Sequence, residues 1–221
     1  MKLGLDIGLH NLLFGDGDGG GGGFDTTGLV ARWGFNGNVE DSSPNELDGT
    51  EINGPLSYVA GVYGQAVDLD SAASQEINFG PSTDLDLTDE FTFCGWVTPS
   101  ALGSLQYLID IGGGSYVRIN ADGKIRFAWN SSTTSDTALS AATLHYVSAG
   151  YDGTNRWIRI DKGTRKEQVG APRADLLNPL VRIGARSSGN FVDGLMEDWY
   201  YWVRTLTDDE LDDLQDGNGP Y

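Results

Sequence analysis

The chain has 221 residues, which is enough for one large domain with a sizeable core, or for one domain with an appendage. Its formal net charge of −18 would repel a phosphate backbone, so nucleic acid is not expected as a partner. The 32 glycines, six tryptophans and nine tyrosines are typical of an all-β sandwich with many tight turns. The acidity fits two interpretations, namely solubility in a salty medium or binding of a divalent cation. No apolar stretch is long enough for a membrane span.

Residues 1–24 differ from the rest of the chain. The apolar residues Leu3, Leu5, Ile7 and Leu9 alternate with others, which predicts an extended strand, and Phe14 follows. Residues 19–23 are consecutive glycines, which form a flexible tether. A lone apolar strand is unstable in water and needs a partner surface. Two interpretations stay open: the arm pads its own domain as an edge strand, or it is an assembly arm that adds a strand to another subunit.

The first eight residues do not read as a signal peptide. They contain a single lysine, and Asp6 falls where the apolar core of such a peptide would lie. No cleavage site of small residues follows, so we expect the chain to lack a secretion address.

From residue 29 onward the pattern is one of strands and turns. Strands are predicted over residues 29–35, 64–70, 91–97, 107–111, 116–120, 124–129, 144–151, 156–161, 181–185 and 195–203. The Asp122–Gly123 pair predicts a hairpin between residues 116–120 and 124–129. Strands at this spacing predict a sandwich of two sheets.

Two local features are expected to be structural. The single cysteine, Cys94, lies inside an apolar strand, which predicts a buried and unreactive thiol with no disulfide partner. One short helix is predicted after Thr207, whose side chain would form a capping box with Glu210, while Leu206 and Leu211 form a hydrophobic staple.

A series of short motifs runs along the chain. Residues 193–211 read D-G-L-M-E-D-W-Y-Y-W-V-R-T-L-T-D-D-E-L, residues 33–37 W-G-F-N-G, residues 41–49 D-S-S-P-N-E-L-D-G, residues 61–67 G-V-Y-G-Q-A-V and residues 91–97 F-T-F-C-G-W-V. The segments H-Y-V and Y-D-G follow at residues 145–147 and 151–153. In order and spacing, over about residues 29–214, this set resembles the laminin-G-like members of the concanavalin A-like lectin/glucanase superfamily. The resemblance implies an all-β, two-sheet antiparallel jelly-roll sandwich over residues 25–221, with an extended N-terminal arm and one short C-terminal helix.

The resemblance also implies a structural calcium ion where the early Asp-Ser loop meets the late acidic pair. Asp41, Asn45 and Asp48 would offer loop oxygens and Glu197 a carboxylate from the closing strand. Calcium prefers six to eight oxygen ligands, which such a set supplies in part. The family has Asp and then Glu where this chain has Glu197 and then Asp198.

Alternation along the closing strand predicts which face Glu197 occupies. One face, apolar except for the glutamate, should carry Leu195, Glu197, Trp199, Tyr201 and Val203. A carboxylate buried there needs a partner, either the metal ion or an arginine such as Arg32.

Relatives of this kind bind glycans or proteins. Sugar sites favour aromatic platforms beside polar groups, so Trp96, Tyr116, Arg118 and Trp129 are predicted to contact a ligand. The alternative is that these aromatic side chains fill the core of the sandwich.

No catalytic residue is predicted. Glycoside hydrolases of this superfamily carry two glutamates around a central acid on one strand, and no E-x-D-x-E occurs here. Glu197 and Asp198 are adjacent, and strand alternation places them on opposite faces. His10 and His145 do not form a cluster. The sequence therefore predicts a protein that is not an enzyme.

These features together predict a structural and adhesive component of a bacteriophage virion, as a capsid decoration or a tail-associated protein. The arm would dock to other virion subunits or to copies of the chain, and the sandwich would face outward on the virion surface and contact glycans. The alternative is a cellular lectin-like carbohydrate-binding module that works outside the cell.

Overall fold

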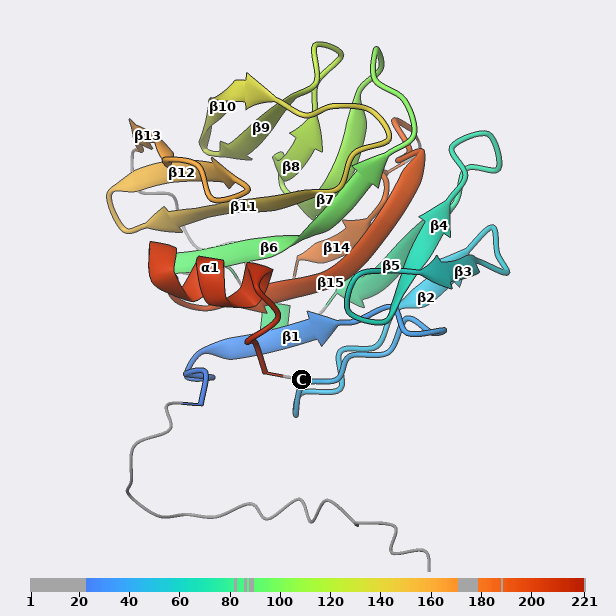
Figure 1. The fold of residues 1–221 in the computed structure, drawn as a ribbon, viewed down its shortest axis with the longest axis horizontal. Helices are drawn as coiled ribbons and strands as arrows, with labels where there is room; N and C mark the ends of the chain where they lie inside the picture. Colours follow the sequence, from blue (N-terminus) through green and yellow to red (C-terminus); the bar gives the residue numbers. More distant parts are fainter. Residues whose placement is uncertain are drawn as a thin grey trace, which may run out of the picture.

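The computed structural model describes residues 23–220, apart from residues 82, 86, 88, 89, 171–178 and 188. Within them the chain forms two antiparallel sheets that pack face to face, as predicted (Figure 1). The fold is a jelly-roll sandwich with one short α-helix near the C-terminus. That helix is not long enough to cross a membrane, and no other described helix is.

The first sheet has eight strands. Its order is β13 (Lys166–Val169), β12 (Asn155–Ile160), β11 (His145–Asp152), β6 (Glu90–Pro99), β15 (Gly194–Trp202), β4 (Gln65–Leu69) and β3 (Ser57–Ala60), while β1 (Leu29–Trp33) also pairs with β15.

The second sheet has seven strands. Its order is β10 (Ser131–Ala138), β9 (Lys124–Trp129), β8 (Ser115–Ile119), β7 (Gln106–Gly112), β14 (Leu180–Ile183), β5 (Glu76–Pro81) and β2 (Thr50–Ile52). A short 3-10 helix, η1 (Thr83–Leu85), lies between β5 and β6.

The main core lies between the two sheets. It is built from the inward-facing residues at alternating positions of the strands, such as Ile125 and Phe127 in β9 and Phe91 and Phe93 in β6. Phe93 stacks on Tyr201 of β15 with ring centroids 4.6 Å apart. Burial of so many large apolar side chains is the main source of stability for this sandwich.

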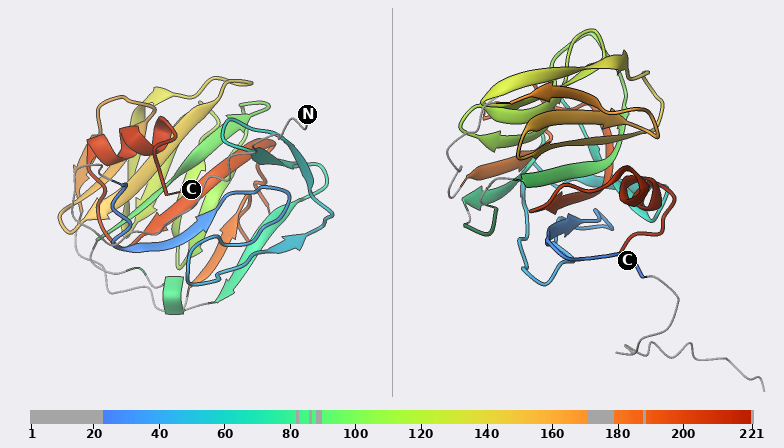
Figure 2. Two further views of the ribbon diagram at one scale, coloured as in Figure 1. Left: turned by 60° about the horizontal axis from the view of Figure 1, so that its bottom comes forward. Right: turned by 90° about the vertical axis from the view of Figure 1, so that its left-hand side faces the viewer.

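A second apolar cluster covers part of the outer face of the eight-stranded sheet. Helix α1 (Asp208–Gln215) lies over this face (Figure 2) and contributes Leu211 and Leu214 to the cluster that also contains Trp157 and Trp202. The predicted capping box is present, because Thr207 accepts from the Glu210 amide at 3.2 Å while the Glu210 carboxylate accepts from the Thr207 amide at 2.7 Å.

Strand β15 contains a bulge that changes which side chains face the core. Asp198 has a φ of +51°, and the register with β6 shifts between Glu197 and Tyr200. Met196 and Trp199 both join the inner core, whereas strict alternation would place them on opposite faces. The predicted grouping of Glu197 with Trp199 on one face is therefore wrong, because the bulge inserts an extra residue between them.

The ten strands predicted from apolar patterns are all present, and the predicted hairpin joins β8 to β9 with Gly123 at a φ of +79°. The structure adds β2, β3, β5, β10 and β13, which are short or polar.

Cys94 is fully buried, and burial raises the pKa of its thiol to about 12.

Gly95 shows how closely β6 and β15 pack at the bulge. A Cβ added at Gly95 would lie 2.5 Å from the Trp199 ring, whose Nε1 donates to the Trp96 carbonyl at 3.0 Å. We expect Gly95→Ala to lower the free energy of unfolding by about 1–3 kcal/mol, because the buried ring must move. Urea unfolding followed by tryptophan fluorescence measures the loss. Gly189→Ala is the control, since nothing lies within 4 Å of an added Cβ there.

Candidate functional site

The acidic pair of the closing strand is held by two separate sets of partners. The Glu197 carboxylate accepts from the Val62 amide at 2.7 Å and the Tyr63 amide at 2.6 Å. The Asp198 carboxylate accepts from Arg32 Nη2 at 2.9 Å, in a pair that is largely buried. Of the partners considered for Glu197, Arg32 pairs with Asp198 instead.

Both carboxylates lie on the outer side of the eight-stranded sheet. Glu197 lines a hollow with Trp96 and Val62, while Asp198 contacts Tyr200, which belongs to the outer cluster. The bulge removes the alternation on which the prediction of opposite faces rested. Each carboxylate serves as a fixed hydrogen-bond acceptor, and Glu197 holds the loop that contains Val62.

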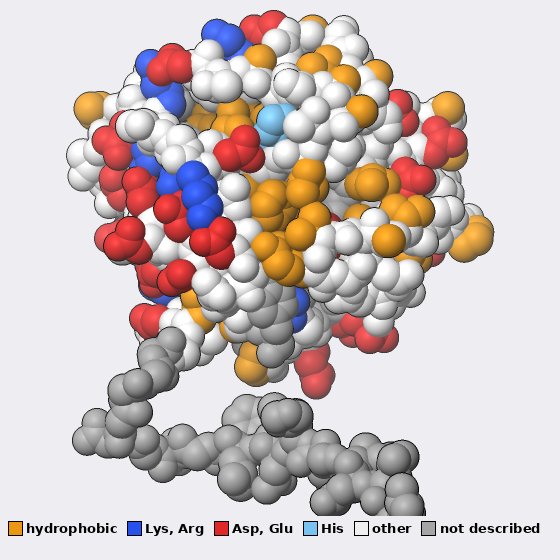
Figure 3. Space-filling model, in the orientation of Figure 1, with side chains coloured by type: hydrophobic (Ala, Val, Ile, Leu, Met, Phe, Trp, Pro, Cys, Tyr) orange, Lys and Arg blue, Asp and Glu red, His pale blue; other side chains and the backbone are white. Residues whose placement is uncertain are grey.

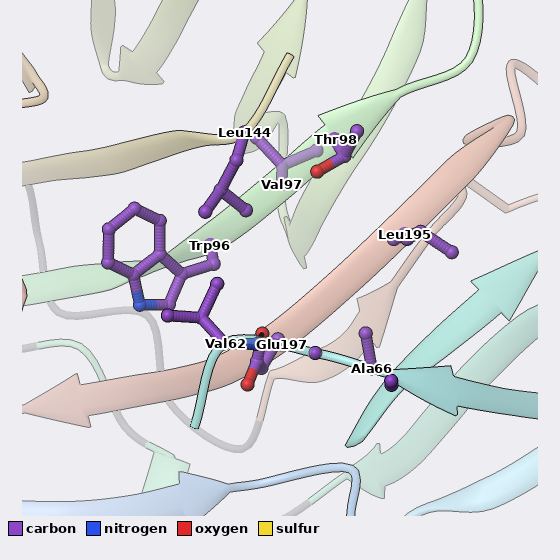
Figure 4. Close-up of a pocket in the computed structure, with 10 residues that line it drawn as sticks. Val62, Ala66, Trp96, Val97, Thr98, Leu144, Leu195 and Glu197 are labelled. Carbon is purple, nitrogen blue, oxygen red and sulfur yellow. Dashed lines mark hydrogen bonds between the residues drawn. The ribbon is translucent and has the colours of Figure 1, made fainter. Parts of the chain in front are cut away.

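Trp96 and Glu197 line the same hollow (Figure 4). The volume of this hollow is about 210 Å³. Leu144 and Val62 flank the indole ring, and their exposed fractions are 38% and 50%. Seen from outside, this region is an apolar patch on the face that carries α1 (Figure 3). Trp96 is itself 7% exposed and packs edge-on against Tyr146, so most of its surface is structural.

Tyr116 and Arg118 lie on the outer face of the other sheet, opposite the side that carries α1. The Arg118 guanidinium stacks over Tyr116, with its carbon 5.0 Å from the ring centroid. Its Nη1 donates to the Tyr107 hydroxyl at 2.8 Å, and its Nε donates to Asn120 Oδ1 at 3.0 Å. Arg186 covers the same two tyrosines from β14's side of the sheet and also donates to the Tyr107 hydroxyl at 3.0 Å.

A polar cavity of about 400 Å³ borders this cluster. Its walls are the β7–β8 turn, the outer face of β9 and the β9–β10 turn, contributing Gly113, Gly114, Arg126, Ala128, Asn130, Ser131 and Ser132. Ala128 is the cross-strand partner of Tyr116, which connects the cavity to the arginine–tyrosine cluster. Hydroxyl, amide and guanidinium groups in such a wall match the hydrogen-bonding groups of a sugar.

The predicted ligand residues thus do not form one site. Trp129 is 1% exposed and packs edge-on against Phe91 in the main core, with ring centroids 5.1 Å apart, so it cannot meet a ligand. Trp96 lies on the eight-stranded sheet, whereas Tyr116 and Arg118 lie on the seven-stranded sheet. Only the last two share a surface.

Sequence reasoning missed Tyr107, Arg186, Asn130, Ser131 and Ser132. Tyr107 is the cross-strand partner of Arg118 in the β7–β8 pair, but the sequence did not set that register, and Arg186 comes from a segment far away in the chain. The serines belong to β10, whose sequence of Ser, Thr and Asp lacks apolar alternation. The turn signal of Gly113 and Gly114 was available in the sequence, but it indicates only where the chain reverses.

The four residues predicted to hold calcium do not fit one ion. The Asp41 carboxylate accepts from the amides of Arg32, Ser43 and Leu47 at 2.8, 2.8 and 3.0 Å, and from the Ser43 hydroxyl at 2.7 Å.

The other predicted ligands are also engaged. Asp48 accepts from the Asp41 amide at 2.9 Å, Asn45 donates to the Val30 carbonyl at 2.7 Å, and Glu197 accepts from the amides of the β3–β4 loop. Among the described residues, no group of three or more His, Cys, Asp or Glu side chains could hold a metal ion. Calcium binding by this chain therefore stays a prediction, without a site formed by these residues.

The residues predicted for assembly, Leu3, Leu5, Ile7, Leu9 and Phe14, lie outside the described part of the chain. Among the described residues of this end, Phe24 contacts the sandwich, and its ring centroid lies 5.7 Å from that of Trp202. Arg204 adds hydrogen bonds from its Nη2 to the Asp25 carbonyl at 3.0 Å and from its Nε to the Thr27 carbonyl at 2.7 Å. The chain is thus fixed to the outer cluster from residue 24 onward.

Comparison with known families agrees with this architecture. Residues 70–212 match the family model for laminin G domains that is described as the concanavalin A-like lectin/glucanases superfamily. The chain therefore belongs to this superfamily. A search of curated protein sequences gave no match.

Solved structures share the fold at low sequence identity. Domain 4 of AbnA, an extracellular GH43 arabinanase from Geobacillus stearothermophilus solved with arabinotriose, superposes with a TM-score of 0.69 at 17% identity. The match covers 84% of this chain and 97% of that domain.

The botulinum neurotoxin serotype D ligand-binding domain, solved with N-acetylneuraminic acid, gives a TM-score of 0.68 at 12% identity over 86% of this chain and 51% of that one. The binding domain of Paraclostridial Mosquitocidal Protein 1 gives 0.66 at 15% identity, over 86% of this chain and 52% of that one. The chain thus spans nearly all of the arabinanase domain and about half of each toxin domain.

Asp41 provides a test of whether its loop is organised by hydrogen bonds or by calcium. We expect Asp41→Asn to lower the free energy of unfolding by about 1–3 kcal/mol, because one buried acceptor oxygen and its charge are lost. The loss should be the same in calcium and in EGTA when urea unfolding is measured. A loss confined to calcium-containing buffer would show that Asp41 acts as a metal ligand. Glu40→Gln, at the exposed neighbouring position, is the control.

Proposed function

We propose that this protein is a non-catalytic, lectin-like module that binds glycans through the outer face of its seven-stranded sheet. The observation that carries this proposal is the polar cavity of about 400 Å³ beside Tyr116 and Arg118. Its walls offer donors and acceptors on rigid strands and tight turns, so a sugar would bind without reorganising the site. The arabinanase domain solved with arabinotriose and the toxin domain solved with N-acetylneuraminic acid support a sugar as the ligand.

The absence of catalysis is part of this proposal. Retaining hydrolysis needs two carboxyl groups about 5 Å apart that are free to reach one bond. Glu197 and Asp198 are committed to backbone amides and to Arg32, on the sheet opposite the polar cavity. The cavity wall itself has no carboxylate among its lining residues.

We further propose that residues 1–24 attach the module to a bacteriophage particle, with the sandwich outward on the virion surface. The alternating leucines, followed by the glycine run, suit a strand that pairs with a scaffold or with another copy of the chain. The N-terminal segment joins the sandwich near α1, on the side opposite the polar cavity (Figure 2). Attachment there would leave the proposed glycan face free.

Blocking the cavity tests the glycan-binding part of the proposal. Ser131 is exposed at the cavity wall, so Ser131→Trp fills the space without disturbing the core. We expect the substitution to lower glycan affinity at least tenfold on a glycan array and in titration calorimetry, with an unchanged melting temperature. The control is Thr164→Trp, at an exposed position in the turn that follows β12 and outside the cavity wall. Equal binding by both variants would remove the cavity from the proposal.

Truncation tests the attachment part. A chain that begins at Phe24 keeps the contact with Trp202 and loses the apolar arm. We expect the full chain to form oligomers, or to bind purified particles, while the truncated chain stays a monomer with the same melting temperature. Light scattering after size-exclusion chromatography measures the mass. If both chains are monomers and neither binds particles, the cellular lectin alternative replaces the virion role.

A further inference from the structure

We propose that the outer face of β8 and β9 recognises the carboxylate of an acidic sugar, which Arg118 and Arg126 bind. This inference rests on the proposed glycan-binding function and names the class of glycan that would bind. The two arginines are direct cross-strand partners in the β8–β9 pair. Like charges at opposed positions of two strands destabilise a sheet. Such a pair therefore needs a compensating anion, from the protein or from a ligand.

The described part of the chain does not supply that anion. None of the described carboxylates forms an ion pair with Arg118 or Arg126. Instead, both guanidinium groups are held by neutral partners. Arg126 donates from Nη2 to the Ser132 hydroxyl at 2.8 Å, while its Nε is buried without a hydrogen-bond partner among the described residues. Within the described residues, no carboxylate compensates the positive charge of either arginine.

The nearby acidic groups are already engaged by other arginines. Arg182 Nε lies 3.5 Å from Glu76 Oε1, and its Nη1 lies 3.8 Å from Asp110 Oδ2, while Arg186 Nε lies 4.0 Å from Asp110 Oδ1. Burial raises the pKa of both Glu76 and Asp110, while their arginine partners lower it. This face therefore carries a local positive charge in a chain with 32 acidic and 14 basic residues.

The arginines are also positioned before any ligand arrives. Arg118 is fixed by Asn120, by the Tyr107 hydroxyl and by the Tyr116 ring. An arginine held in this way loses little side-chain entropy when it binds a carboxylate, and its planar group matches that anion. The polar cavity begins beside Arg126, so a sugar ring in the cavity would bring its carboxylate to the arginine pair.

The net charge limits the kind of acidic glycan. A polymer with an anion on each sugar would be repelled by the net charge of −18 over its whole length. A glycan with a single acidic sugar responds mainly to charges within about 8 Å at physiological salt, which here are the arginines. The site therefore fits an oligosaccharide with one sialic or uronic acid rather than a polyanion.

An array of neutral oligosaccharides and their sialylated or glucuronylated counterparts tests this inference, with lactose and 3′-sialyllactose as the first pair. We expect the full-length protein to bind an acidic member at least tenfold more tightly than its neutral partner. Arg118→Gln, outside the cavity wall, should remove most of that preference and leave affinity for the neutral partner unchanged. Arg126→Gln, at the cavity wall, should remove the preference and also weaken binding of the neutral partner. Lys162→Gln, which removes a positive charge paired with Asp216 elsewhere on the surface, should have no effect.

The outcomes separate this inference from the proposed function. Equal binding of acidic and neutral partners, lost in Ser131→Trp, would keep the glycan site and overturn the acidic preference. Binding of no glycan would overturn both. The melting temperature adds an independent readout, because removing one member of a like-charged pair should leave it unchanged or raise it. A lower melting temperature in Arg126→Gln, with unchanged glycan binding, would show that the arginine is structural.

Discussion

The structure depends on the central position of β15 and on the bulge within it. This strand pairs with β6 along its length, with β4 over its first half and with β1 over its second half. A bulge in such a strand would leave two carboxylates and several backbone groups buried and unsatisfied. Glu197 meets this constraint by accepting from the loop at Val62, and Asp198 by pairing with Arg32 of β1. The acidic pair therefore ties a loop and an edge strand to the centre of the sheet.

This arrangement gives the two sheets different outer faces. The eight-stranded sheet is covered in part by α1 and by the chain from Phe24 onward, and its uncovered part is the apolar patch around Trp96 (Figure 3). The seven-stranded sheet carries arginines, tyrosines and a polar cavity instead. One outer face is thus partly apolar and partly covered, whereas the other presents polar and cationic groups. Superfamily membership supplies the sandwich, whereas the ligand depends on the side chains placed on it.

Most of the fold could be predicted from the sequence because apolar alternation and turn residues act locally. The strands over β6, β8, β9 and β11, the Gly123 hairpin and the Thr207 cap all follow from such patterns. β10 could not be predicted, because its pairing with β9 depends on backbone hydrogen bonds and its side chains are polar. The direction of the Glu197 side chain was also predicted wrongly, because the bulge at Asp198 shifts the alternation. That bulge depends on distant partners, namely Arg32 of β1 for Asp198 and the loop at Val62 for Glu197.

The sequence by itself determined the class of fold, the position of the strands and the helix, and the burial of Cys94. These features follow from the pattern of apolar residues and from local capping chemistry. Only the tertiary structure decided that Trp129 belongs to the core, that Trp96 and Tyr116 lie on opposite sheets, and that Arg186 joins Tyr107 and Tyr116. Strand register and sheet packing set these relations, because they join residues that are distant in the chain and that no local pattern connects.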